Sequence, residues 1–286
     1  MTKIDINSQT CIKCGKCVRI CPSQILMQNS KGAPIEVVQP ENCILCGHCV
    51  GVCPTNAITH SEFPAEKIHP LDYSSYPTAG QMMALCKGRR SNRAFSSHPI
   101  PEEKLGQILA AAHRAPTASN LQQVDFTLVT DPEKLRSISE FTLRTFLRAR
   151  KKLSNPFLKP LIKLSMPDAF RYIPVFDRLQ QEYKAGNDMI LRKATAVILI
   201  HTPKSNRFGC MDANLAYQNG SLMAECLGVS QFYTGFVCSA VQQDGKGKLE
   251  KSLGINGIIQ AGMALGMPEF RFINYIDKKD ITVRKI

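Results

Sequence analysis

Apolar and polar positions follow a regular pattern only in the larger, C-terminal part of the chain. Residues 61–78 carry three prolines and show no apolar periodicity, and regular patterning resumes at Gln81. Prolines stiffen a segment that has no apolar face to bury, so we interpret 61–78 as an extended linker. The 286 residues then divide into a small domain over 1–60, this linker, and a larger domain over 79–286.

Helical patterns recur along the larger domain. Residues 79–88 predict a short helix, and a second helix starts with Pro101 at its first position. Its buried face is expected to comprise Leu105, Ile108, Leu109 and Ala112. Asp131 is a typical cap for a long helix, and the pattern over 212–227 is again helical.

Four segments of the larger domain have the pattern of strands. Residues 124–129 alternate, and the continuous apolar run 194–200 predicts a central strand. We expect two further strands over 231–237 and 257–264. Scattered strands among long helices predict an α+β fold. Neither G-x-G-x-x-G after a strand nor G-x4-G-K-[ST] occurs, so a nucleotide-binding Rossmann unit is not expected.

Eight cysteines in the first sixty residues form two copies of the pattern C-x2-C-x2-C-x3-C-P. This run binds a cubane iron–sulfur cluster, and with two copies the fourth cysteine of each run ligates the other cluster. We therefore assign Cys11, Cys14, Cys17 and Cys53 to one [4Fe–4S] cluster, and Cys43, Cys46, Cys49 and Cys21 to a second. A zinc site would need only two C-x2-C pairs, and disulfides would need an export context.

Charge and composition narrow the classes of partner. The formal net charge is +13, but two oxidised clusters would lower it to about +9. No nucleic-acid-binding motif accompanies this charge, so we expect no nucleic-acid partner. The longest apolar run, 194–200, is far too short to span a membrane, and we expect no membrane contact.

The N-terminal residues lack an apolar signal region, so we expect a cytoplasmic, reducing location. In that compartment the remaining cysteines should be reduced and buried as small apolar residues. They are Cys86, Cys210, Cys226 and Cys238.

A basic cluster follows the first predicted helix. In an extended turn Arg89, Ser91 and Arg93 point the same way and can converge on one anion such as a phosphate. The stretches RRSNRAF and HPIPEEKLGQILAAAHRAPTASNLQ resemble the opening of the nitroreductase family of FMN enzymes. ANLAYQNGSLMAECLGV, FYTGF and LGINGIIQAGMALGMPEF resemble later segments of that family, so the resemblance spans about residues 82–280. The first domain closely resembles bacterial-type ferredoxins with two [4Fe–4S] clusters.

These resemblances imply a ferredoxin-like domain followed by a mixed sheet flanked by helices, and a homodimer that binds FMN. The FMN phosphate and ribityl chain would contact Arg89, Arg90, Ser91 and Arg93. One edge of the flavin ring would be lined by Pro116, Thr117, Ser119 and Asn120. The backbone N–H near Gly235 would face the flavin N5, and Lys278 or Lys279 would take the place of a late arginine at the phosphate. No protein residue is assigned a catalytic role, because in this family the flavin performs the chemistry.

The expected function is that of an iron–sulfur flavoprotein oxidoreductase. Two clusters would pass single electrons to FMN, and FMN would reduce a small organic acceptor such as a nitro compound, quinone or activated alkene. A donor protein of the ferredoxin or flavodoxin type fits this scheme, and direct reduction by NAD(P)H stays open. The alternatives are a dehydrogenase or oxidase that runs in reverse, and a non-catalytic electron carrier or redox sensor.

One stretch departs from the core pattern. Between Glu140 and Asp168 there are seven basic residues, no acidic ones and many interleaved apolar ones. We interpret it first as a lid helix and loop over the active site. A docking surface for an acidic redox partner comes second, and a membrane-surface patch is a further alternative.

Overall fold

The contacts within the chain divide it into two units. The computed structural model describes residues 2–286. The first unit runs to Tyr76 and includes Ala118–Leu121, and the second comprises Pro77–Thr117 and Gln122–Ile286. The boundary after Tyr76 falls inside the segment that we predict as a linker. That segment is exposed, and it is less extended than expected, because it contains the 3-10 turns η2 (Ala65–Lys67) and η3 (Tyr73–Ser75).

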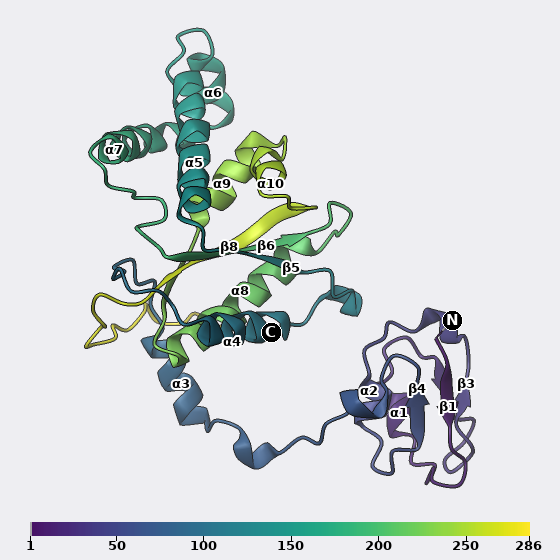
Figure 1. The fold of residues 1–286 in the computed structure, drawn as a ribbon. Coiled ribbons are helices and arrows are strands. Elements are labelled where there is room, and N and C mark those ends of the chain that lie inside the picture. Colours follow the sequence, from purple (N-terminus) through teal and green to yellow (C-terminus); the bar gives the residue numbers. More distant parts are fainter. Residues whose placement is uncertain (1) are drawn as a thin grey trace. The chain divides into compact units, whose positions relative to one another are not determined.

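The first unit consists of two short antiparallel strand pairs and two short helices (Figure 1). Its elements are β1 (Ile4–Ile6) paired with β4 (Ile58–His60), β2 (Leu26–Met27) paired with β3 (Glu36–Val37), α1 (Lys16–Ile20), α2 (His48–Gly51) and the 3-10 turn η1 (Pro40–Asn42). Gly15 and Gly47 precede the two helices with φ values of 68° and 72°, a conformation that a residue with a Cβ rarely adopts. The backbone therefore turns in the same way inside each cysteine run.

The second unit is built on a four-stranded antiparallel sheet in the order β5-β6-β8-β7. The strands are β5 (Asp125–Val129), β6 (Ala196–Thr202), β7 (Ser230–Tyr233) and β8 (Ile258–Gly266). Every residue of β6 is buried, as predicted for a central strand. Alternate side chains of β6 enter two separate apolar cores, with Val197 and Leu199 in one and Ile198 and Ile200 in the other.

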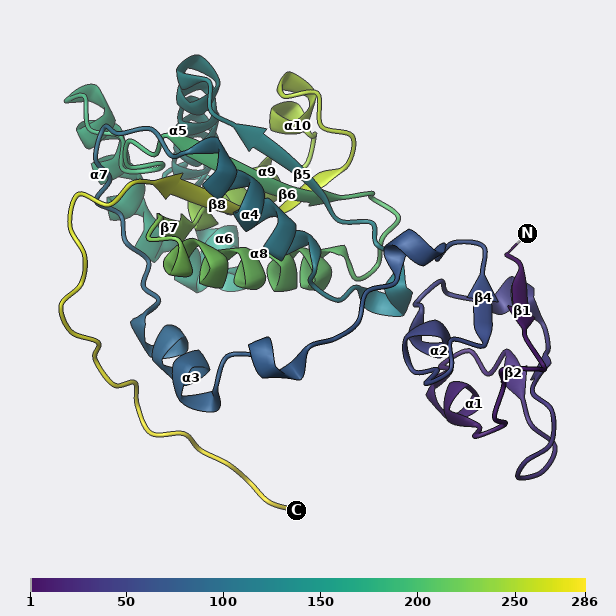
Figure 2. The same cartoon turned by 60° about the horizontal axis from the view of Figure 1, so that its bottom comes forward.

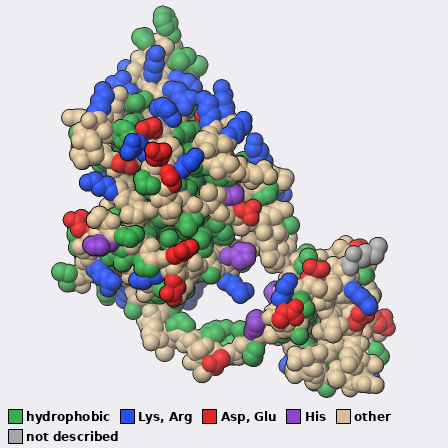
Figure 3. Space-filling model, viewed as in Figure 1, with side chains coloured by type: hydrophobic (Ala, Val, Ile, Leu, Met, Phe, Trp, Pro, Cys, Tyr) green, Lys and Arg blue, Asp and Glu red, His purple; other side chains and the backbone are tan. Residues whose placement is uncertain are grey.

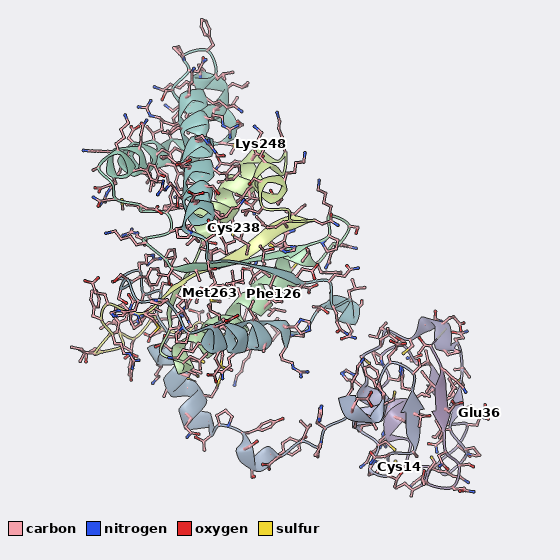
Figure 4. All side chains as sticks on the ribbon, in the orientation of Figure 1. Cys14, Glu36, Phe126, Cys238, Lys248 and Met263 are labelled. Carbon is pink, nitrogen blue, oxygen red and sulfur yellow. The ribbon has the colours of Figure 1, made fainter. Side chains whose placement is uncertain are left out.

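Helices cover both faces of this sheet (Figure 1). On one face lie α4 (Glu102–His113) and α8 (Gly209–Cys226), and on the other lie α5 (Pro132–Leu153) and α9 (Gly235–Asp244). Met263 on β8, labelled in Figure 4, is 1% exposed and packs in the apolar core between the sheet and the helices α4 and α8. The α+β fold predicted from the sequence is confirmed, but the four strands pair antiparallel where a mixed sheet was expected.

Most predicted helices are present, with small shifts at their ends. The helix α3 (Ala79–Gly88) begins after Thr78, which forms a capping box with Gln81. Pro101 is the N-cap of α4, so the expectation that it starts the helix is wrong by one residue. Asp131 caps α5, where its Oδ1 accepts a hydrogen bond of 2.8 Å from the Lys134 backbone N–H.

Two predictions about the second unit are wrong. The strand expected over 231–237 ends at Tyr233, and α9 begins at Gly235, because Val237, Ala240 and Val241 are buried with helical spacing. Of the four remaining cysteines only Cys238 is buried. The other three lie on α3, which buries no residue, and in the first and last turns of α8.

The basic–apolar stretch belongs mainly to two helices. It forms the C-terminal half of α5 and the whole of α6 (Lys159–Ser165). A 3-10 turn, η5 (Pro167–Tyr172), and α7 (Ile173–Lys184) follow, and α10 (Lys248–Ser252) comes later in the chain. Figure 3 shows Lys and Arg side chains gathered over this part of the second unit. Phe157 and Leu164 are 92% and 86% exposed. The two roles proposed for this stretch, a lid over the active site and a docking surface, stay predictions.

Residues after β8 run without helix or strand to the C-terminus (Figure 2). The part nearest the sheet is fixed to the loop of residues 89–93, because the Asn92 side-chain amide donates a hydrogen bond of 2.9 Å to the Phe270 carbonyl. Within residues 2–286 no helix combines the length and apolar character needed to cross a bilayer.

Candidate redox sites

Four cysteines from both sequence runs line one cavity of the first unit. Cys11, Cys14, Cys17 and Cys53 all border it, together with apolar side chains that include Ile6, Ile35 and Ile58. Figure 4 labels Cys14 on the loop that leads into α1. Cys53 belongs to the second run in sequence, yet in the structure it lies with the cysteines of the first run, where the spacing predicts it.

The other four cysteines form a second group. The pKa of the Cys49 thiol is raised to about 11, mainly by burial and also by the nearby thiols of Cys43, Cys46 and Cys21. Such thiols release their protons when a bound metal supplies compensating positive charge. The chemistry of this group therefore fits an iron–sulfur cluster.

A cluster needs a different ligand arrangement from a single ion. Among residues 2–286 no three His, Cys, Asp or Glu side chains converge closely enough to bind one metal ion. A cubane requires no such convergence, because each of its four thiolates binds a different iron. Both cysteine groups are compatible with that pattern.

Hydrogen bonds to sulfur occur in both groups. The Ala57 N–H donates to Cys53 Sγ at 3.2 Å, and the Leu45 N–H donates to Cys43 Sγ at 3.4 Å. Although burial acts to raise it, the pKa of the Cys53 thiol is lowered overall by the backbone N–H groups of Thr55 and Ala57. These donors favour the thiolate that metal binding requires. The sulfur of Cys43 also lies near the side chain of His60.

The basic loop of the second unit, residues 89–93, lies between β7 and the segment after β8. Ser91 forms a parallel bridge with Gln231, and the Gln231 side-chain amide donates to the Arg90 carbonyl at 3.4 Å. Asn92 holds the other side of the loop through its bond to the Phe270 carbonyl. These contacts fix the loop backbone, and the arginine side chains extend from it.

Two of the three arginines share a neighbour. The pKa of Tyr217 is raised to about 12 by burial, against the opposing effect of the positive charges of Arg89 and Arg93. The Tyr217 hydroxyl and the Gln231 side-chain oxygen are 2.8 Å apart, and the Arg93 guanidinium lies 5.3 Å from the centroid of the Phe232 ring. This cluster supplies two cations beside buried aromatic rings.

Arg90 points elsewhere. Its guanidinium donates to the Ile276 carbonyl at 3.3 Å and lines a cavity of about 180 Å³ together with Arg271. The same C-terminal segment carries Lys278, which is exposed. The structure thus places Arg89 and Arg93 together, and it places Arg90 beside the segment that contains Lys278.

The predicted flavin-edge residues divide between the two units. Pro116 and Thr117 belong to the second unit, where Thr117 Oγ1 accepts a bond of 3.0 Å from the Gln122 N–H. Ser119 and Asn120 belong to a turn grouped with the first unit. There the Asn120 side chain donates to the carbonyls of residues 44 and 45 at 3.0 and 2.8 Å. A joint role of these four residues at one flavin stays a prediction.

Gly235 starts α9 directly after β7. The N–H groups in the first turn of a helix have no partner within the helix, so this position can offer a donor to a bound group. Thr234 N–H donates to the Gly262 carbonyl at 3.0 Å and fixes the chain where it leaves the sheet.

Sequence reasoning missed several residues of these sites. Tyr217, Gln231, Arg271 and His60 gain their positions only from tertiary contacts. Gln231 alone carried a local signal, since it is a polar residue within an apolar strand and is 1% exposed. A buried polar side chain normally has a specific partner.

Comparisons with known proteins agree with both units. The model of the nitroreductase family matches residues 86–267, and that of the 4Fe-4S dicluster domain matches residues 10–57. An NADPH-dependent oxidoreductase of Staphylococcus saprophyticus is 26% identical over 193 residues, which are 65% of this chain and 64% of that protein. An NADH dehydrogenase of Thermus thermophilus is 46% identical over 52 residues, 18% of this chain and 25% of that protein. The matches thus span less than two thirds of each of these two relatives.

Solved structures share the fold of the second unit. A nitroreductase with bound FMN from Bacteroides fragilis superposes with a TM-score of 0.54 at 20% identity, covering 72% of this chain and 99% of that one. A nitroreductase with bound FMN from Desulfitobacterium hafniense gives a TM-score of 0.54 at 18% identity, covering 71% and 97%. At these identities the likeness establishes the fold.

Proposed function

The chain belongs to the nitroreductase family, and from this premise we propose that it is an iron–sulfur flavoprotein that carries electrons from two [4Fe–4S] clusters to FMN and on to a small organic acceptor. The acceptor class that fits is a nitro compound, a quinone or an activated alkene. The observation that carries the proposal is the pairing of the cysteines, with Cys53 beside Cys11, Cys14 and Cys17, and Cys21 beside the other three.

The first unit would hold both clusters through these eight thiols. Bound clusters supply reversible one-electron steps. The protein contributes the apolar wall of Ile6, Ile35 and Ile58, which limits water, and the backbone donors to Cys43 and Cys53. Solvent exclusion and hydrogen bonds to sulfur are the means by which a protein sets a cluster potential.

The second unit would hold FMN. Arg89 and Arg93 provide two guanidinium groups for the phosphate and ribityl chain, with Arg90, Ser91 and Lys278 as further contacts. Positive charge near the flavin ring would also stabilise its anionic reduced form. We assign the ring edge to Pro116, Thr117, Ser119 and Asn120, and the donor to N5 to the Gly235 N–H. The bound FMN of the Bacteroides fragilis and Desulfitobacterium hafniense structures supports this choice of flavin.

Donor and assembly are part of the same proposal. We propose a homodimer that takes electrons from a ferredoxin- or flavodoxin-type protein. The names of the Staphylococcus saprophyticus and Thermus thermophilus relatives favour nicotinamide as a second donor. They also favour the alternative that the protein is a flavin-dependent dehydrogenase that works in the opposite direction.

Cofactor analysis and anaerobic reduction test the proposal. We expect about eight irons and eight sulfides per chain, as two cubane clusters require, and one acid-released FMN. The protein is then reduced without oxygen, first with NADPH and next with a low-potential ferredoxin, before a nitroaromatic is added. Reoxidation of the flavin by the acceptor supports a reductase. A plateau near four irons, FAD in place of FMN, or no turnover with any acceptor class contradicts it.

A further inference from the structure

His60 lies against a cysteine sulfur in the first unit. It is the last residue of β4 and is 5% exposed. Its Nε2 is 3.6 Å from Cys43 Sγ, and its Nδ1 accepts a hydrogen bond of 3.1 Å from the Glu62 backbone N–H. The Phe63 ring packs against the imidazole with the two centroids 4.7 Å apart. The ring is thus held at both nitrogens and on one face.

These contacts decide which ring nitrogen carries the proton. Nδ1 accepts from an N–H, so it has no proton of its own, and the single proton of a neutral imidazole must lie on Nε2. His60 therefore directs an N–H at the sulfur of Cys43.

The other half of the unit lacks this contact. The two cysteine runs repeat with an offset of 32 positions, so Gln28 is the counterpart of His60. The Gln28 amide donates to the carbonyls of Lys13 and Ala33 at 2.9 and 2.8 Å. Within the described part of the first unit, His60 is the one side-chain nitrogen that forms a hydrogen bond to a cysteine sulfur.

We propose that His60 is a positioning residue that raises the reduction potential of the cluster bound by Cys43, Cys46, Cys49 and Cys21. This inference rests on the proposed function, because it requires a cluster at these cysteines. A donor to the thiolate withdraws electron density from the sulfur and so stabilises the reduced cluster, which carries one more negative charge. In the other ligand group the side-chain contact to sulfur comes from a hydroxyl, Thr55 Oγ1 at 3.7 Å from Cys53 Sγ. The effect of an imidazole N–H is therefore confined to the cluster of Cys43.

A potentiometric titration of the anaerobic full-length holoprotein, followed by EPR, tests this. The variant His60→Phe retains an aromatic ring but removes the N–H. We expect about a tenfold change in the ratio of oxidised to reduced cluster at a fixed potential, which is about 59 mV downward for a one-electron couple. The variant Cys43→Ser identifies which of the two signals moves.

Two further variants separate the hydrogen bond from packing. His60→Gln can still donate an N–H, so it should recover most of the potential. Gln28→Leu removes the counterpart side chain and should leave the potential of the Cys43 cluster unchanged. Equal shifts in His60→Phe and His60→Gln would overturn the inference, because loss of packing alone would explain them.

A measurement on the unsubstituted protein avoids any effect on folding. With ¹⁵N-labelled histidine, pulsed EPR should detect a nitrogen coupled to one reduced cluster, and the coupling should vanish in His60→Gln. If both clusters are assembled but no such coupling exists and His60→Phe leaves both potentials unchanged, the inference is wrong and the proposed function stands. If the holoprotein has no cubane signals, the proposed function itself fails.

Discussion

Cys21 and Cys53 connect the two halves of the first unit. Each follows a helical turn of its own run, yet the Cys53 thiol lines the cavity of the first run, and the Cys21 thiol acts on Cys49 of the second. Three thiols on one tight loop can reach three corners of a cube, and the fourth corner needs a residue from elsewhere. The tertiary structure therefore supports the same two ligand sets that the spacing predicts.

Replacement of Cys21 with Ala should disrupt the distant cluster and leave the adjacent one. We expect loss of the cluster of Cys43, Cys46 and Cys49, with iron content reduced by up to about half. Cys53→Ala is the matched variant and should affect the other cluster. Iron analysis and EPR of anaerobically purified protein distinguish the two. Loss of the signal of Cys11, Cys14 and Cys17 in Cys21→Ala would show that the ligands do not cross.

Arg89 and Arg93 should determine how firmly FMN is held. Arg89→Gln and Arg93→Gln each remove a charged hydrogen-bond donor, which costs about 1.5–3 kcal/mol, or roughly a ten- to hundredfold weaker site. Arg207→Gln is the control, because Arg207 is exposed and lies over the Phe208 ring. Flavin content is measured after gel filtration. Unchanged FMN in both single variants and in the double variant would place the phosphate elsewhere.

Single residues differed in how well the sequence predicted them. The two groups of cysteines could be proposed from sequence because a cluster imposes a spacing on a short stretch of chain, and their role as ligands stays a prediction. His60 and Tyr217 were not, because their roles depend on neighbours such as Cys43 and Gln231 that only the fold brings close.

Among the elements, β6 is the center of the second unit. It pairs with β5 on one side and β8 on the other, and its pairing with β8 is irregular between Ile200 and His201. His201 is 7% exposed, and its Nε2 lies 3.0 Å from Thr127 Oγ1 on β5. A titratable ring is thus buried where three strands meet.

His201 should make the second unit less stable in mild acid. Burial lowers the pKa of His201 in the folded protein, against the opposing effects of Asp125 and Glu250. The unfolded chain then binds the proton more readily, so the contribution of His201 is present above its unfolded pKa of about 6.5 and is lost as the pH falls. One such site changes the free energy of unfolding by at most about 1.4 kcal/mol per pH unit.

His201→Gln should therefore show a weaker loss of stability between pH 7.5 and pH 5.5. Urea unfolding followed by far-UV circular dichroism reports on the second unit, because α1 and α2 of the first span only five and four residues. His69→Gln is the control, since His69 is exposed in the linker segment. An unchanged pH dependence in His201→Gln would assign the acid sensitivity to other groups.

Element prediction succeeded where one pattern dominated. The run 194–200 is apolar except for Thr195 and is rich in β-branched residues, which favours a buried strand. Residues 231–237, in contrast, contain a strand and a helix start joined at Thr234. Both pieces are short and apolar, so periodicity could not separate them.

At the scale of the whole molecule, the eight cysteines and the basic loop fall in different units. All eight cysteines of the two runs precede the boundary at Tyr76, and the basic loop follows it. The second unit also has two apolar cores of its own on either face of its sheet. A domain with its own core can fold independently.

A chain that begins at Pro77 should therefore fold, bind FMN and retain flavin chemistry. Reduced with dithionite, it should convert a nitroaromatic at a rate close to that of the full chain. With reduced ferredoxin as donor, the full chain should turn over and the shortened one should be slow, because its clusters are missing. Equal rates with ferredoxin would mean that electrons do not enter through the first unit.

The positions of Cys21 and Cys53 also bear on how the protein would respond to oxygen. If both clusters bind as proposed, an oxidant that destroys one of them leaves three vacant thiols in one half of the unit and one in the other, because each cluster would draw one ligand from the opposite run. With apolar packing limited to a few side chains such as Ile25, Leu26 and Ile58, little else holds the halves together. Damage at one cluster should therefore spread to the other, and inactivation by oxygen should be a single event whose repair requires both clusters to be rebuilt.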